Sequence, residues 1–144
     1  MNRQQDGLQL SERLEFLGLG SEEKRDLAAL KPAISASLDA SLNTFYKKAK
    51  AVPATAKFFD SDAHIQHAKA MQIKHWETIA SGVYDSQYTE AVTAIGRTHA
   101  RLGLEPRWYI GGYALILEGI ITSVVESQFQ SFMVKNKGKK VARD

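Results

Sequence analysis

Histidine is the side chain of this sequence best suited to metal chemistry, since the 144 residues include four histidines and no cysteine. One of the four, His99, opens the run HARLGLEPRWYIGGY over residues 99–113. A neutral imidazole can bind a metal ion through one ring nitrogen while the other nitrogen donates a hydrogen bond. A buried histidine that only packs and hydrogen-bonds a carbonyl group is the alternative. The spacing of the residues does not decide between these two roles.

The other three histidines, His64, His67 and His75, fall within one predicted helix. His64 and His67 are three residues apart, a spacing at which two imidazoles can chelate zinc. The segment lacks the His-Glu-x-x-His pattern and has no glutamate at ligand spacing on the same face. We therefore expect a solvated helix surface here, with a zinc site as the alternative.

The helix that must position His99 is predicted over residues 86–102, with Ser86 as its N-cap. Its apolar positions recur at steps of three and four residues, which is typical of a helix with one buried side. Gly103 is expected to end this helix in the left-handed conformation, and Pro106 suits the first turn of the next one. Gly96 lies one turn before His99 on nearly the same side, so a flat group could approach the imidazole closely. The apolar stripe consists of Tyr88, Ala91, Val92, Ile95, His99 and Leu102.

The preceding part of the chain predicts three helices, over residues 8–17, 21–31 and 32–50, with Pro32 starting the third. At about 100° per residue, Tyr46 falls roughly 80° from the centre of the apolar stripe of the third helix. We therefore expect Tyr46 to border the core, with its ring packed and its hydroxyl in water. The stripe consists of Ile34, Leu38, Leu42, Phe45 and Ala49.

The remaining two helices are predicted over residues 62–81, between the cap Ser61 and Gly82, and from Pro106 toward Phe129. The last helix is apolar over more than one side and needs a neighbour besides its own core. We predict a homodimer through this helix; a fully internal helix is the alternative that composition leaves open. One side carries Trp108, Tyr109, Tyr113, Leu117, Ile121, Val124 and Val125, and the others carry Ile110, Ala114, Ile116 and Ile120.

Composition and pattern place the chain among all-α domains, since no strand pattern, internal repeat or phosphate-binding glycine motif occurs. A hydrophobic fraction of 44% argues against disorder. The absence of cysteine excludes disulfides, thiolate ligation of heme and iron–sulfur clusters. No stretch is expected to reach the length of a membrane span, and the N-terminus lacks the pattern of a secretion signal. We expect a cytoplasmic protein without a membrane partner.

The basic character of the chain is concentrated at its end. The net charge is +3 and the isoelectric point about 9.1, but five of the 19 basic residues lie within residues 135–144, together with one acidic residue. The rest of the chain is therefore close to neutral, which is unlike a nucleic-acid-binding surface. We divide the chain into a domain over residues 1–134 and a basic tail or start of a linker over residues 135–144.

The run over residues 99–113, written as His-x-Arg-Leu-Gly-Leu-x-Pro-x-Trp-Tyr-Ile-Gly-Gly-Tyr, resembles the signature of the globin-coupled sensors. These are the heme-binding sensory globins of bacterial and archaeal signalling proteins, and the resemblance covers residues 14–126. It implies a globin-like fold of about six to eight helices around a pocket for heme b. It also implies that His99 is the proximal ligand of the iron. Tyr46, in an unchanged Phe45-Tyr46 pair, would donate a hydrogen bond to heme-bound oxygen.

Further pocket residues follow from the same resemblance. Met71 stands in the pocket where some relatives carry a second hydrogen-bonding group, so this chain departs from them there. Gln72 could replace that group if its helix is rotated slightly. His75 becomes a candidate partner of the heme propionates, together with Lys74, Arg97 and Arg101. The candidate walls of the pocket are Leu42, Phe45, Leu104, Trp108, Tyr109 and Tyr113.

The function implied by the resemblance is that of a gas sensor. The domain would bind oxygen, carbon monoxide or nitric oxide, form a homodimer through its last helix and signal to an output such as a chemotaxis transducer or a diguanylate cyclase. One alternative is a heme enzyme, a nitric oxide dioxygenase or peroxidase, but no distal histidine–arginine pair is evident. The other is a heme-free signalling module of globin-like fold, against which the presence of both Tyr46 and His99 argues.

Overall fold

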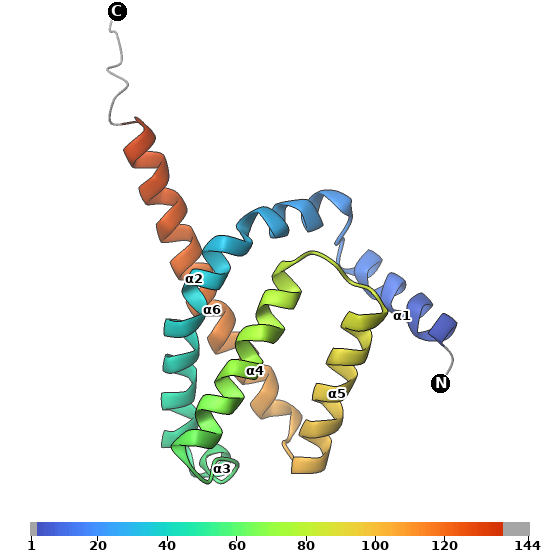
Figure 1. Ribbon diagram of the computed structural model, residues 1–144, viewed down its shortest axis with the longest axis vertical. Helices are drawn as coiled ribbons and strands as arrows, with labels where there is room; N and C mark the ends of the chain where they lie inside the picture. The colour runs from blue at the N-terminus through green and yellow to red at the C-terminus, as the bar shows by residue number, and fades with distance from the viewer. Residues whose placement is uncertain (1–2, 137–144) are drawn as a thin grey trace, which may run out of the picture.

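The computed structural model of the protein describes residues 3–136 and folds them into six α-helices (Figure 1). No strand occurs within this described range, and the prediction of an all-α fold is confirmed. The helices are α1 (Arg3–Phe16), α2 (Ser21–Ala51), α3 (Pro53–Ala56), α4 (Asp62–Ala80), α5 (Ser86–Leu102) and α6 (Pro106–Asn136).

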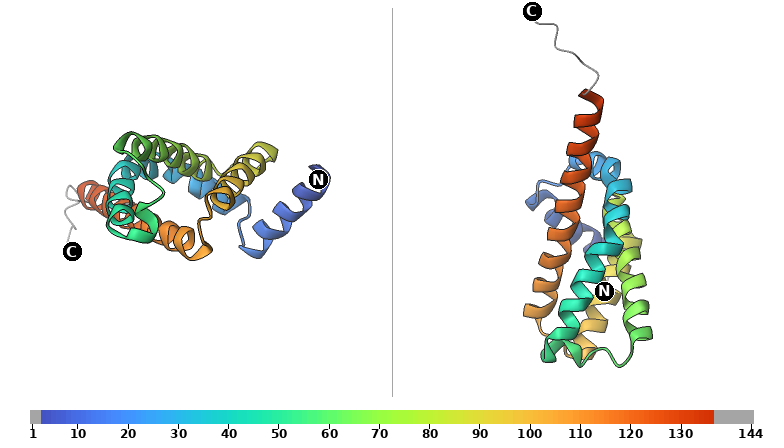
Figure 2. Two further views of the ribbon diagram at one scale, coloured as in Figure 1. Left: turned by 90° about the horizontal axis from the view of Figure 1, so that it is seen from below. Right: turned by 90° about the vertical axis from the view of Figure 1, so that its left-hand side faces the viewer.

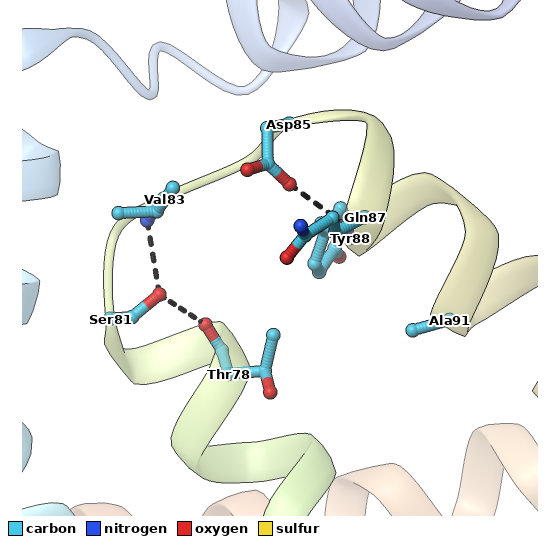
Figure 3. Close-up of a pocket in the computed structure, with 7 residues that line it drawn as sticks. All are labelled: Thr78, Ser81, Val83, Asp85, Gln87, Tyr88 and Ala91. Carbon is cyan, nitrogen blue, oxygen red and sulfur yellow. Dashed lines mark hydrogen bonds between the residues drawn. The ribbon is translucent and has the colours of Figure 1, made fainter.

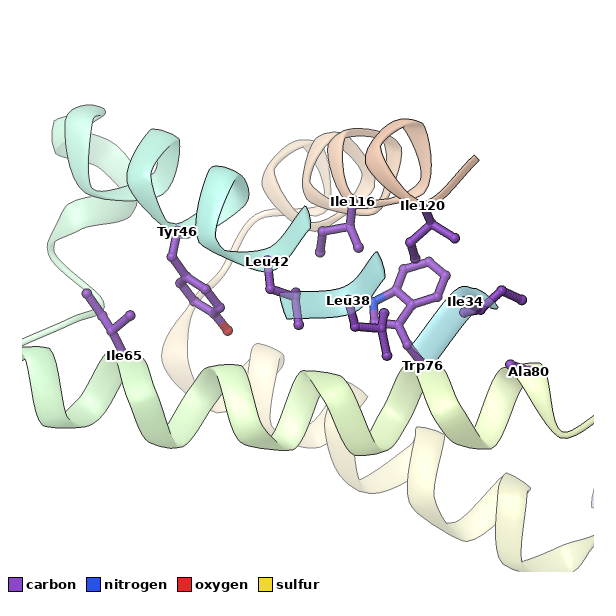
Figure 4. Packing of buried hydrophobic residues seen from close by; sticks show 9 residues of the cluster. All are labelled: Ile34, Leu38, Leu42, Tyr46, Ile65, Trp76, Ala80, Ile116 and Ile120. Carbon is purple, nitrogen blue, oxygen red and sulfur yellow. The ribbon is translucent and has the colours of Figure 1, made fainter. Parts of the chain in front are cut away.

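Helix α2 is the centre of the fold, because it packs against both α4 and α6. The side chains of Leu38, Leu42 and Ile116 are fully buried where these helices meet. Burying an aliphatic side chain of this size stabilises a fold by about 1.5–3 kcal/mol. Figure 4 shows the core cluster, which consists of Ile34, Leu38, Leu42, Tyr46, Ile65, Trp76, Ala80, Ile116 and Ile120.

The predicted break before Pro32 is wrong, because α2 is one helix of 31 residues with Pro32 inside it. A proline in a helix interior removes one backbone hydrogen bond and crowds the preceding turn. In Figure 1, α2 crosses the top of the molecule and then turns downward instead of running straight. Residues on both sides of Pro32, among them Leu30 and Ile34, pack on the same core. This shared packing explains why the helix continues through the proline and does not end there.

Helix α6 approaches α2 closely through two glycines. A Cβ atom added at Gly119 would lie 2.7 Å from Ser41 Oγ, and one at Gly112 would lie 3.0 Å from Phe45 Cε2. The two glycines are seven residues apart, which is about two helical turns and places them on the same side of α6. This glycine side of α6 therefore faces α2.

The other side of α6 is apolar and exposed. On the apolar surface of α6, Leu117 and Ile121 are exposed, whereas Ile116 and Ile120 are buried. The last turns of α6 extend beyond the other helices (Figure 2). By length and composition α6 could cross a membrane, so the expectation that no stretch reaches that length is wrong, although core helices of soluble proteins meet the same criterion. The large exposed side chains include Ile110, Leu117, Ile121, Val125, Phe129 and Phe132.

Capping residues, glycines and prolines in the sequence correctly predicted several helix ends. Asp85, and not the predicted Ser86, is the N-cap of α5, and its Oδ1 accepts a hydrogen bond from the Tyr88 N–H at 3.0 Å. This one-residue difference leaves the helix where we expected it. The predicted ends are confirmed at Ser61, Gly82, Gly103 and Pro106.

The connection between α4 and α5 lies against the first turn of α2. Gly82 has a φ of +70°, and a Cβ atom there would collide with the carbonyl oxygen of Lys24. Both the left-handed backbone and the close approach require glycine. The Lys24 ammonium also lies 5.8 Å from the centroid of the Tyr84 ring. The start of α5 is therefore fixed to α2.

The predicted division of the chain after residue 134 remains a prediction. Helix α6 continues through that point to Asn136. The other residues of the predicted basic tail, 137–144, lie outside the described residues.

Candidate functional site

Helix α5, which carries His99, is amphipathic in sequence but has no buried residue. Its stripe is only half-buried at Tyr88, Val92, Ile95 and His99. The helix packs most extensively against α1. An amphipathic helix normally covers its apolar side with packed protein. The His99 side of α5 is therefore open to another group.

A pocket of about 320 Å³ adjoins this side of α5 (Figure 3). It lies between the last turns of α4, the connection to α5 and the first turns of α5. Tyr88 and Ala91 line it and also belong to the apolar stripe of α5, so the pocket is continuous with the open side of the helix. Its lining residues are Thr78, Ser81, Val83, Asp85, Gln87, Tyr88 and Ala91.

The His99 imidazole is held in a state suited to metal ligation. Its ring stacks on that of Tyr109 from α6, with centroids 5.6 Å apart and an interplanar angle of 16°. Burial lowers the pKa of His99 below its usual value of 6.5, which favours the neutral imidazole. A Cβ atom added at the neighbouring Gly96 would meet nothing within 4 Å, so this part of the helix surface is open.

Tyr46 is more deeply buried than the sequence pattern indicated. Its residue is only 5% exposed, and burial raises the pKa of its hydroxyl to about 12. The prediction that it borders the core is wrong, because α2 packs on two sides and its buried surface is wider than one stripe. The ring makes edge contacts with Phe45 and Phe59 and points from α2 toward α4 (Figure 4). Within residues 3–136 its hydroxyl has no hydrogen-bond partner, so a neutral donor remains available.

A polar pair joins α4 to α6 near this space. The hydroxyl of Tyr113 and Nε2 of His75 lie 2.8 Å apart. Burial and then the charge of His99 lower the pKa of His75, while burial and then Tyr88 raise the pKa of Tyr113. Both shifts favour the neutral forms, so the two groups share a hydrogen bond between neutral partners whose direction depends on the tautomer of His75. Because His99 and Tyr88 of α5 affect the pKa values of His75 of α4 and Tyr113 of α6, side chains from these three helices lie near one another.

The other predicted wall residues are distributed unevenly. Leu42 is fully buried in the core, whereas Met71 is 55% exposed. Next to Met71, Gln72 is half-buried, and its Oε1 is buried without a hydrogen-bond partner. Gln72 is therefore the inward residue of this turn of α4. The pocket roles of all these residues remain predictions. Half-buried positions are found at Phe45, Leu104, Trp108, Tyr109 and Tyr113.

The histidines at the start of α4 do not form a metal centre with other residues. Among the residues that the structure describes, no three His, Asp or Glu side chains are grouped to hold a metal ion. Nδ1 of His64 instead lies 3.1 Å from the carboxylate of Asp60, and His67 is exposed. This part of α4 therefore gives no support to the zinc alternative.

The open side of α5 fits heme. Heme is a flat and largely apolar group whose iron takes an axial nitrogen ligand. His99 offers a neutral imidazole, Gly96 leaves room beside it, and the buried residue Tyr46 offers a neutral hydroxyl. The residues present therefore match the cofactor that the sequence resemblance implied.

An all-α domain with a histidine on the open apolar side of one helix and a buried tyrosine on another has the properties of a globin-type sensor domain. The family model named Protoglobin matches residues 6–142. The chain belongs to the Protoglobin family, and the predicted relation to the globin domains of globin-coupled sensors is confirmed.

One relative is the heme-based aerotactic transducer HemAT of Halobacterium salinarum. It is 27% identical to this chain over 138 residues, which make up 95% of the chain. The same region is 27% of the relative, so the chain spans about a quarter of the length of that protein. The similarity therefore concerns one part of the transducer.

Proposed function

We propose that this domain binds heme b through His99 and senses oxygen, carbon monoxide or nitric oxide at the heme iron. The observation that carries the proposal is the open apolar side of α5, which presents a neutral imidazole. Membership of the Protoglobin family and similarity to a heme-based aerotactic transducer support it. The domain is a sensor, and we assign no catalytic residue to it.

His99 is suited to ligation in both protonation and orientation. A metal ligand must be deprotonated, and burial already favours the neutral form of this imidazole. The Tyr109 ring lies nearly parallel to the imidazole and restricts its rotation. Nε2 of His99 is the atom that we assign to the iron. When bound, the heme supplies the metal at which a diatomic gas coordinates.

Tyr46 supplies a hydrogen bond to the gas. Its pKa of about 12 keeps the hydroxyl protonated at every physiological pH. A hydrogen bond of this kind contributes about 0.5–1.5 kcal/mol, and about twice as much when the acceptor carries negative charge. Oxygen accepts such a bond better than carbon monoxide does, so Tyr46 favours oxygen over carbon monoxide.

The residues that we assign to the surroundings of the heme are the walls of its pocket and the partners of its propionates. Half-buried Phe45, Tyr109 and Tyr113 supply aromatic wall surface. Leu42, Met71, Leu104 and Trp108 complete the proposed walls. Exposed cationic side chains are available to the heme propionates, namely Lys74, Arg97 and Arg101.

Sensing requires that the gas bind two arrangements of the protein with different affinity. Helix α6 is placed to respond, because Tyr109 touches His99 and Leu117, Ile121 and Val125 form an exposed apolar side. We assign this side to the contact of a cytoplasmic homodimer. The output is a signalling domain, by analogy with the aerotactic transducer.

Absorption spectroscopy tests the proposal directly. The purified protein, supplied with hemin and reduced with dithionite, is expected to show a Soret band that shifts on addition of oxygen and of carbon monoxide. His99→Ala should lose the band after removal of free hemin, whereas the control His67→Ala, at an exposed position of α4, should keep it. A wild-type protein without a Soret band would refute heme binding. An unchanged spectrum of His99→Ala would remove His99 from its role.

A further inference from the structure

Two buried polar atoms of α4 have no hydrogen-bond partner within the described part of the chain. They are Oε1 of Gln72 and Nε1 of Trp76. Trp76 is only 7% exposed and belongs to the core cluster, so its indole N–H is shielded from bulk water. An unsatisfied buried polar group destabilises a fold, and native proteins leave very few of them. These two atoms therefore require a partner other than the surrounding side chains.

The two atoms are placed to share one partner. Gln72 and Trp76 are four residues apart, so they lie on the same face of α4 with about 5–6 Å between their Cβ atoms. In Figure 4, α4 runs from Ile65 to Ala80, and the nitrogen of the Trp76 ring is on the edge turned toward the Ile65 end. Gln72 lies in that direction along the helix. The space between the two side chains is therefore bordered by an acceptor and a donor.

The chemistry of this pair selects the molecule that can bind there. The amide oxygen of Gln72 only accepts hydrogen bonds, and the indole nitrogen of Trp76 only donates one. A bridging molecule must donate to the first and accept from the second. Oxygen and carbon monoxide have no hydrogen to donate. Water meets both requirements, and internal waters typically join polar groups that have no other partner.

We infer that Gln72 and Trp76 bind one internal water molecule on the α2-facing side of α4. The water donates to Oε1 of Gln72 and accepts the N–H of Trp76. Oxygen or carbon monoxide could not replace this water as the bridge, because neither can donate a hydrogen bond to Oε1 of Gln72. It also satisfies a polar side chain next to Leu38 and Leu42, the two fully buried leucines of α2.

Nuclear magnetic resonance tests this site without reference to heme. The chain has two tryptophans, so Trp108→Phe leaves one indole signal, that of Trp76. The experiment uses the full chain, both without heme and as its diamagnetic ferrous carbon monoxide form. A nuclear Overhauser cross-peak is expected between the indole N–H and a long-lived water. Gln72→Met, which keeps the length of the side chain but removes the acceptor, should abolish that cross-peak and shift the indole resonance.

The matched control is Gln66→Met, the same substitution at an exposed position of α4, which should leave the cross-peak unchanged. Thermal unfolding monitored by circular dichroism shows that each variant is folded. A cross-peak from the indole to the Gln72 side chain, with none to water, would overturn the inference. Persistence of the water cross-peak in Gln72→Met would also overturn it. A failure of heme binding would leave the result in the heme-free protein unaffected, so the two proposals fail separately.

Discussion

Helices α2 and α5 both have an apolar side, but only α2 buries it. The side of α2 is filled from two directions by α4 and α6, which leaves Leu38 and Leu42 fully buried. The side of α5 that carries His99 is at most half-buried. An apolar stripe thus indicates that one side of a helix must be buried, but it does not indicate whether protein or a bound group buries it. The proposed cover of α5 is heme, and the following variants test this difference between the two helices.

The largest contrast is expected between Leu38→Ala and Ile95→Ala in the heme-free protein. Truncation of the fully buried Leu38 should lower the free energy of unfolding by about 2–5 kcal/mol. Truncation of the half-buried Ile95 should lower it by roughly 1 kcal/mol or less. Urea denaturation with and without hemin measures both effects, and only the Ile95 effect should grow with hemin. Equal losses at the two positions without hemin would mean that α5 is packed as tightly as α2.

Tyr46→Phe separates the packing of the buried Tyr46 ring from the hydrogen bond that we propose for its hydroxyl. In the heme-bound protein it should speed oxygen dissociation by about 2- to 13-fold, which corresponds to 0.5–1.5 kcal/mol. Without heme it should leave stability unchanged or higher, because the lost hydroxyl has no partner. Stopped-flow kinetics and urea denaturation measure these effects.

Tyr84→Phe is the control for this variant, because the Tyr84 hydroxyl donates to the carbonyl of Ile79 at 3.0 Å. It should lower stability without changing oxygen dissociation. An unchanged dissociation rate in Tyr46→Phe would remove Tyr46 from the gas site.

A smaller effect is expected from acid. Burial holds the pKa of His75 and of His99 below the ordinary value of 6.5. Between the lowered and the ordinary pKa the unfolded chain binds more protons than the folded one, so stability falls as the pH drops below about 6.5. Urea denaturation of the heme-free protein between about pH 7.5 and 5.5 should show this fall. His75→Gln should make it shallower, and greater stability in acid would contradict the expectation.

The exposed side of α6 provides the smallest expected effect on stability. Ile121 is 52% exposed, so Ile121→Asp should change the free energy of unfolding of a monomer by no more than about 0.5 kcal/mol. The same change should prevent the proposed homodimer, which analytical ultracentrifugation detects. A wild-type protein that stays monomeric at all concentrations would refute the dimer.

Local signals in the sequence were sufficient for much of the fold. Gly82, Gly103 and Pro106 have backbone requirements that hold in almost any context, and each marks a helix end as predicted. Pro32 did not, because packing on both sides of it holds α2 together. Propensity is overridden in this way when a helix has a large surface to bury.

The site was predictable only where one residue or one short run carries the signal. The run that follows His99 singles it out as the candidate ligand, whereas the burial of Tyr46 depends on α2 having two neighbours. The pairing of His75 with Tyr113 joins positions 38 residues apart and leaves no local pattern. The sequence left open which side of α6 faces the core, because the helix is apolar on both sides, and in the structure the glycine contacts with α2 distinguish the two sides.

The contact of Gly82 with Lys24 has a mechanical consequence. It fixes the start of α5 to α2, and the stacking of His99 on Tyr109 holds the other end. Helix α5 is thus held near both of its ends, and none of its residues is buried in the core. Between its ends α5 can bend sideways while the core stays intact. A flat molecule can therefore enter beside this helix without global unfolding of the protein.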